Sequence, residues 1–143
     1  MKVIELNFEY HSNNGFDTLK SFLKKIEIFQ WDGFLPRKKL HSVIQRKHCG
    51  MEFLTEFEHC INRLNPDIIV TRGGDALHFA ALDKLAKRVG FDMNLSRTKC
   101  ELKPRSMSRV VHSYGQVIRK DAYFPLNGRL HIDLSARFIV REG

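Results

Sequence analysis

Hydrophobic and polar residues alternate over three segments in the first third of the chain. The alternation runs over residues 2–9, 26–31 and 40–45, and a period of two is typical of β-strands with one buried face. Within the first segment, Asn7 and Glu9 project from the same face of the predicted strand. The sequence therefore predicts three strands, the first of which presents two polar side chains side by side.

The apolar pattern changes to a helical period further along the chain. Apolar residues recur at intervals of three and four over residues 51–65 and 75–89, which predicts two helices. Pro66 stops the first of them and Gly90 ends the second. A shorter helix is predicted over residues 16–24, between the first two strands.

A continuous apolar run lies between the two long helices. Residues 67–71 read Asp-Ile-Ile-Val-Thr, which is typical of a central strand covered on both faces. Gly73, Gly74 and Asp75 follow as a turn. Strand, glycine turn and helix make the βα unit of an open α/β sheet, in which ligands bind at the carboxyl ends of strands.

The last third of the chain predicts a loop and two more strands. Residues 96–109 are polar and basic, as in a loop or linker. Residues 113–119 and 129–134 predict strands, joined by the turn-forming residues of 121–128. Together these elements predict an α/β fold with a central mixed sheet flanked by helices.

The composition indicates one globular domain. The chain has 143 residues, 43% of them hydrophobic, and no apolar run approaches the roughly 18 residues of a membrane span. Its first residues lack the apolar stretch of a signal peptide. The three cysteines, Cys49, Cys60 and Cys100, are sparse and odd in number, which argues against a disulfide framework. We expect a cytoplasmic protein with free thiols and no membrane partner.

The formal charge of +8 favours polyanionic partners such as nucleic acid. Two basic segments carry most of the excess, and we expect their cations to track a phosphate backbone. The ten cations are Arg37, Lys38, Lys39, Arg46, Lys47, Arg97, Lys99, Lys103, Arg105 and Arg109. A solvated charged face is the alternative. Tyr114 and Tyr123 either stack on unpaired bases or fill a hairpin core.

Two His-Cys doublets raise the question of a zinc site. They are His48-Cys49 and His59-Cys60. Compact zinc sites space their ligands by two to four residues, and adjacent residues on a helix point about 100° apart. We therefore predict no metal site from these doublets and place Cys60 in the core stripe of its helix.

Three segments in register resemble the 3′–5′ exonuclease domain of family B DNA polymerases. Residues 65–75, Asn-Pro-Asp-Ile-Ile-Val-Thr-Arg-Gly-Gly-Asp, resemble its second motif, in which a Pro-Asp-apolar strand leads into Asn-Gly-Asp-x-Phe-Asp. Residues 128–134, Gly-Arg-Leu-His-Ile-Asp-Leu, resemble a later strand of the same domain. Residues 3–9 stand where that family carries its first motif, Phe-Asp-Ile-Glu.

The resemblance implies a ribonuclease H-like fold and a single exonuclease-like domain over residues 1–143. The third motif, Tyr-x-x-x-Asp, and any polymerase domain are missing from the sequence. The partners it implies are DNA, single-stranded or primer-template, and the rest of a polymerase or a replication protein. The implied role lies in DNA replication or repair.

The motif positions depart from the family at the residues that would bind metal. Exonucleases of this kind use two divalent metals about 3.5–4 Å apart, which need several carboxylates. Here Asn7 replaces an Asp, Glu9 is retained, and His78 stands at a catalytic Asp. The resemblance assigns Asp75 to the turn. We expect no metal cofactor, no hydrolysis, and a non-catalytic DNA-binding or structural module, similar to the inactivated archaeal group of the family.

Two alternatives remain open from the sequence. In the first, Glu9, His78, Asp75 or Asp133 assemble an atypical Mg²⁺ or Mn²⁺ site and the chain is an active 3′–5′ exonuclease. In the second, the chain is a protein-interaction module that no longer contacts DNA. His78 itself is interpreted either as a metal ligand or as a core or helix-start histidine.

Overall fold

The computed structural model describes residues 1–11, 22–32, 35–98, 102, 110–113, 116–119 and 126–134. Its elements, in chain order, are β1 (Val3–His11), β2 (Phe22–Asp32), β3 (Leu35–Ile44), α1 (Gly50–Leu64), β4 (Ile68–Thr71), the π-helical segment η1 (Gly74–His78), α2 (Phe79–Val89), β5 (Val110–Ser113), β6 (Gln116–Arg119) and β7 (Leu130–Asp133).

Five of the strands form one mixed sheet, which confirms the predicted α/β class. The strand order is β3-β2-β1-β4-β7. The first three strands are antiparallel, whereas β4 runs parallel to both β1 and β7. The antiparallel half follows from short connections along the chain. The parallel half requires a crossover, which α1 provides between β3 and β4.

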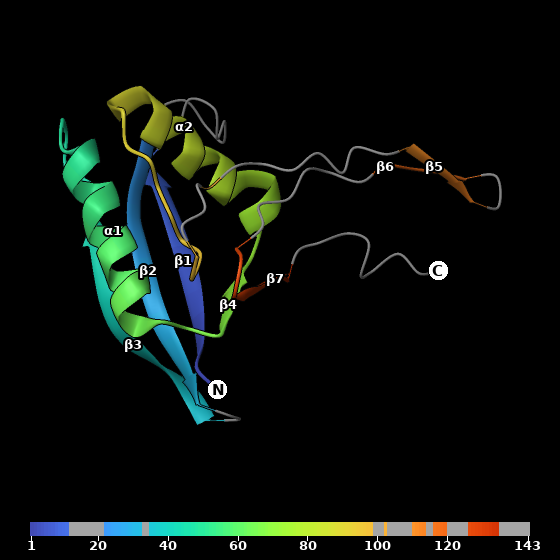
Figure 1. Ribbon diagram of the computed structural model, residues 1–143, viewed down its shortest axis with the longest axis horizontal. Helices are drawn as coiled ribbons and strands as arrows, with labels where there is room; N and C mark the ends of the chain where they lie inside the picture. The colour runs from blue at the N-terminus through green and yellow to red at the C-terminus, as the bar shows by residue number, and fades with distance from the viewer. Residues whose placement is uncertain are drawn as a thin grey trace.

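Both long helices cover the same face of this sheet (Figure 1). Phe53 and Phe57 of α1 and Leu82 of α2 lie in one cluster with Ile4 of β1 and Ile28 of β2, each 0 or 1% exposed. Burying a side chain of this size stabilises the fold by roughly 1.5–3 kcal/mol. The apolar alternation of the strands and the apolar stripes of the helices therefore meet in one core.

The sheet has a step beside β1. The parallel pairing of β1 with β4 ends at Glu5 opposite Val70, but β1 continues to His11. Beyond Glu5, β1 is therefore bordered by the segment that follows β4 rather than by β4 itself. This step, at the carboxyl end of a parallel strand, is where an open α/β sheet places its ligands.

The predicted helix over residues 16–24 is wrong at its end. Residues 22–24 open β2, with Phe22 opposite His11 and Leu23 opposite Tyr10. Residues 16–21 lie outside the described part of the chain. Periodicity cannot separate a short amphipathic helix from a strand over so few residues, and here pairing with β1 decided.

The predicted strand over residues 113–119 is also corrected. Ser113 ends β5 and Gln116 begins β6, and these two residues are paired. Val110 pairs with Arg119, so the segment is an antiparallel pair rather than one strand. Figure 1 shows this pair apart from the five-stranded sheet.

The basic residues 37–39 lie within β3 instead of flanking it. Lys38 pairs with Gln30 and Lys39 with Phe29. β3 is the first strand of the sheet order, and charged side chains on such a strand oppose further strand pairing. In the part of the chain that the structure describes, no helix is long and apolar enough to cross a membrane.

Candidate functional site

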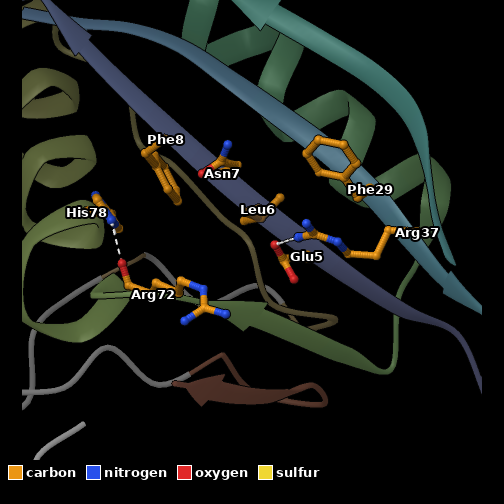
Figure 2. A pocket seen from close by; sticks show the side chains of 8 residues that line it. All are labelled: Glu5, Leu6, Asn7, Phe8, Phe29, Arg37, Arg72 and His78. Carbon is orange, nitrogen blue, oxygen red and sulfur yellow. Dashed lines mark hydrogen bonds and ion pairs between the residues drawn. The ribbon is translucent and has the colours of Figure 1, made fainter. Parts of the chain in front are cut away.

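A cavity of about 180 Å³ opens at the step beside β1. We call it the strand-end cavity. Eight residues line it (Figure 2): Glu5, Leu6, Asn7, Phe8, Phe29, Arg37, Arg72 and His78. They come from β1, β2, β3, the residue after β4, and the end of η1. Tertiary structure therefore brings together two of the three predicted motif residues, Asn7 and His78.

Asn7 lines the cavity, but its side chain is engaged with the neighbouring strand. It hydrogen-bonds to the carboxylate of Glu27, opposite it on β2. Lys39 Nζ lies 2.9 Å from the same carboxylate. That bond is the main reason that the pKa of Glu27 is lowered, and the hydrogen bond from Asn7 adds to it.

Glu9 does not line the strand-end cavity. Its carboxylate lies 3.4 Å from Lys25 Nζ, and its side chain is 46% exposed. Along a strand, a residue two positions on lies about 6.6 Å further away. The retained carboxylate of the first motif is thus paired on the surface, whereas Asn7 stays beside the cavity.

Glu5 is the carboxylate that lines the cavity, and it was not among the site residues predicted from the sequence. It is 5% exposed, and it accepts a hydrogen bond from Trp31 Nε1 at 3.1 Å. Arg37 donates to its other oxygen in a close ion pair (Figure 2). The available signal was the alternation of β1, because Glu5 lies on the same face as Asn7.

Arg37 is held between a carboxylate and an aromatic ring. Its guanidinium carbon lies 5.2 Å from the centroid of the Phe29 ring, as in a cation–π contact. The side chain remains 49% exposed. Glu5 and Phe29 together fix the position of the guanidinium while leaving one side of it open.

Both ring nitrogens of His78 are hydrogen-bonded. Nε2 lies 2.8 Å from the carbonyl of Arg72, and Nδ1 lies 2.7 Å from the hydroxyl of Tyr10. A carbonyl only accepts, so Nε2 carries the proton and Tyr10 donates to Nδ1. Burial lowers the pKa of His78. The imidazole is therefore neutral at pH 7 with no lone pair left for a metal.

The ring of His78 also packs against β1. Phe8 stacks on it with 4.3 Å between the centroids and 9° between the planes. Tyr10 lies on the same imidazole at 5.6 Å, and burial raises the pKa of its phenol. These contacts agree with the interpretation of His78 as a core histidine that joins η1 to β1.

A tight glycine turn places His78 in this position. Gly73 has a φ of 91°, and its N–H donates to Asp133 Oδ1 at 2.8 Å. A Cβ on Gly74 would lie 2.8 Å from Nε2 of His131, so no larger residue fits. The predicted helix over residues 75–89 is present, but its first turn is the π-helical η1.

The turn also accounts for Asp133, one residue of the alternative metal site. Asp133 is 6% exposed and hydrogen-bonds to the turn, and it does not line the strand-end cavity. The side chain of Asp75 lies outside what the structure describes.

The donors in the cavity do not fit a pair of hard divalent cations. Such a pair needs several carboxylates to offset four positive charges. The lining contains Glu5, which Arg37 already neutralises, and adds the positive charge of Arg72. His78 has no lone pair to offer. Among the described residues, no three His, Cys, Asp or Glu side chains are grouped to hold a metal ion.

The predicted DNA-binding cations are divided between surface and fold. Lys38, Lys39, Arg46 and Lys47 are exposed on and after β3, with Lys39 also paired to Glu27. Arg37 lines the cavity. Four of the ten lie outside the described residues: Lys99, Lys103, Arg105 and Arg109. The proposed stacking residues lie outside them too: Tyr114 and Tyr123.

Arg97 is exposed, yet its guanidinium is bonded within the fold. Its Nε donates to Asn65 Oδ1 at 2.9 Å, and Nη1 donates to the Gly128 carbonyl at 3.0 Å. Nη2 donates to the Pro66 carbonyl at 3.2 Å and to Asp67 Oδ1 at 2.7 Å. All three nitrogens of the guanidinium are therefore bonded near the end of α1.

Arg129 donates to the same two residues as Arg97, Asn65 and Pro66. Its Nε donates to the Leu95 carbonyl at 2.9 Å, and Nη1 donates to the Pro66 carbonyl at 2.8 Å and to Asn65 Oδ1 at 3.0 Å. The last carbonyls of a helix lack internal partners and carry partial negative charge, which guanidinium groups offset. Two of the segments behind the family resemblance thus contact each other directly.

The two His-Cys doublets place Cys49 directly before α1 and Cys60 within it. Cys49 and Cys60 are free thiols, and Cys60 packs partly buried against the core. Burial raises the pKa of the Cys60 thiol, and the nearby charge of Glu56 adds to this.

Comparison with solved structures identifies the same fold in a much larger protein. The chain is similar to the family B DNA polymerase from the hyperthermophilic archaeon Pyrobaculum calidifontis, with a TM-score of 0.67 and 20% sequence identity. The match covers 99% of this chain and 16% of that polymerase. The chain thus has the fold of a segment of that polymerase. No protein-family model matches the sequence, and no curated protein does.

Proposed function

We propose that this chain is an exonuclease-like domain of a family B DNA polymerase that holds DNA without cutting it. The structural match extends over 99% of the chain, and the motif resemblance names the exonuclease domain within such a polymerase. The mixed sheet, with three antiparallel strands followed by parallel ones, supports a ribonuclease H-like assignment. The partners would be single-stranded or primer-template DNA and the remainder of a polymerase or a replication protein.

One observation supports the proposal that the chain does not hydrolyse DNA. The carboxylate inside the strand-end cavity, Glu5, is neutralised by Arg37, and Arg72 adds a further positive charge. Two hard cations placed there would be repelled by the arginines and would find one carboxylate, already bonded. The replaced motif positions, Asn7 and His78, support a likeness to the inactivated archaeal group.

A nuclease assay tests the proposal. A single-stranded oligonucleotide labelled at its 5′ end is incubated with the protein and Mg²⁺ or Mn²⁺, and its length is followed by gel electrophoresis. We expect no shortening, because nothing in the cavity holds the metals that would activate water. The Glu5→Gln variant, purified in the same way, is the matched control for contaminating nucleases.

The outcomes separate the candidate functions. Progressive 3′ shortening that Glu5→Gln abolishes would establish an active exonuclease and refute the proposal, whereas equal shortening by both proteins is contamination. Binding of the same oligonucleotide, followed by fluorescence anisotropy, should weaken steeply as salt rises. A chain that binds no oligonucleotide at low salt would instead be a protein-interaction module.

A further inference from the structure

The strand-end cavity carries a net positive charge. Arg37 and Arg72 contribute two positive charges and Glu5 one negative charge, so one positive charge remains. His78 is neutral, because one ring nitrogen accepts from Tyr10 and the other donates to a carbonyl. A cavity with this charge repels metal cations and attracts an anion.

The guanidinium N–H donors of Arg72 are available to a ligand. Its guanidinium is exposed, and within the described part of the chain it makes no hydrogen bond or ion pair. Its backbone is fixed, because the Arg72 carbonyl accepts from His78. Figure 2 shows the side chain leaving the end of β4 and extending along the cavity.

Arg37 also keeps donors free for a ligand. A guanidinium has five N–H donors, and Glu5 is contacted by one terminal nitrogen, Nη1. The Phe29 ring and the Glu5 carboxylate hold the group in place before any ligand arrives. The entropy that a free arginine would lose on binding is therefore already spent.

We propose that the strand-end cavity binds one backbone phosphate of single-stranded DNA through Arg37 and Arg72, without a divalent metal. This rests on the proposed function of holding DNA. A phosphodiester carries a single negative charge, which matches the net charge of the lining. Its two non-bridging oxygens suit the paired donors of a guanidinium. Two arginines would thus take the part in phosphate binding that divalent metals take in the exonucleases the chain resembles.

Anisotropy titrations test the proposal. Fluorescein-labelled oligothymidine is titrated with the full chain in EDTA at several salt concentrations. Removing the contact with this one phosphate should lower the slope of log affinity against log salt by about 0.7, because each phosphate neutralised on a single strand contributes about 0.7. Arg37→Ala/Arg72→Ala should show this change, with affinity at low salt reduced roughly tenfold.

Three variants keep the test independent of folding. Arg72→Ala removes a side chain without a partner in the described structure, and should lower the slope by up to about 0.7 while leaving the melting temperature unchanged. Glu5→Gln/Arg37→Ala removes the ion pair as a unit, so no unpaired carboxylate is left. Arg88→Ala, an exposed arginine of α2 away from the cavity, is the control for loss of charge alone.

The outcomes distinguish this inference from the proposed function. The inference would be overturned, and the proposed function left standing, if the wild-type protein binds DNA and the slope of log affinity against log salt is the same in Arg72→Ala and in Arg37→Ala/Arg72→Ala. Binding that disappears in EDTA would show that metal holds the phosphate and would also overturn it. A wild-type protein that binds no DNA at low salt would refute the function itself.

Discussion

Two residues show that surroundings, not residue type, decide the chemistry of this cavity. Glu5 is a carboxylate of the kind that binds metal, yet Arg37 and Trp31 occupy its oxygens. His78 is a potential ligand, yet its nitrogens bond to Tyr10 and to the backbone. In both cases the groups that a metal would need already serve the fold.

The partly buried imidazole of His78 predicts a pH dependence of stability. Burial lowers the pKa of His78 below its ordinary value of 6.5, so below that pH the unfolded chain takes up a proton before the folded chain does. The contribution of neutral His78 is therefore complete above 6.5 and is lost as the pH falls toward its folded pKa. The loss is at most about 1.4 kcal/mol per pH unit.

Urea denaturation between about pH 7.5 and 5 measures this dependence. As the pH is lowered, the free energy of unfolding of the wild-type protein should decrease more steeply than that of His78→Gln. The control is His59→Gln, at an exposed position of α1. Equal pH dependence in wild type and His78→Gln would show that the imidazole titrates freely.

At the scale of elements, the most informative junction is the end of α1. Arg97 and Arg129 come from different loops, and both donate to the Asn65-Pro66 segment. This junction joins the helix to the start of β7, which lies beside β4. Arg97, which the sequence predicts as a DNA contact, therefore also connects elements of the fold.

The junction predicts that Arg97 affects stability rather than DNA binding. Arg97→Ala should lower the free energy of unfolding by roughly 1–3 kcal/mol, because several carbonyls lose a charged donor. Arg97→Lys should restore little, since an ammonium cannot reproduce the planar fork. The measurement is urea denaturation, with Arg88→Ala as an exposed control near wild type.

The salt dependence of oligonucleotide binding is the second readout for Arg97. The slope of log affinity against log salt should match the wild type in Arg97→Ala, measured without urea at a temperature at which that variant is folded. A lower slope with unchanged stability would place Arg97 on the DNA instead of in the fold.

For the whole molecule, the positive residues behind the net charge of +8 have different roles. Lys38, Arg46 and Lys47 are exposed, whereas Arg97, also exposed, and the partly buried Arg129 donate hydrogen bonds within the fold. Net charge alone therefore overstates the number of cations available to a polyanion, and the other predicted DNA-binding cations that the structure describes lie on and after β3. Counting carboxylates likewise overstates metal binding, because Arg37 already neutralises Glu5, the carboxylate that lines the cavity.

Thermal unfolding tests metal binding by the whole chain. A ligand that binds only the folded protein raises its stability by RT ln(1 + [L]/Kd). We expect millimolar Mg²⁺ or Mn²⁺ to leave the melting temperature of the EDTA-dialysed protein unchanged relative to NaCl of equal ionic strength. A saturable rise in melting temperature, lost in Glu5→Gln, would demonstrate a metal site in the cavity.

The sequence by itself determined the periodic elements. The strands over 2–9 and 67–71 and the helix over 51–65 are found close to their expected places, because their apolar periods match the face they bury. The mixed α/β class followed from the same patterns. Where the pattern was short, over residues 22–24 and 113–119, strand pairing decided against the expected structure.

Only the tertiary structure decided which side chains share the cavity. The extension of β1 past β4 brings Glu5 and Asn7 beside His78 but leaves Glu9 paired with Lys25. Partners such as Arg37 come from strands whose register the sequence does not specify. Periodicity tells which face a residue takes along its own strand, whereas distance between strands depends on pairing and on where each strand ends.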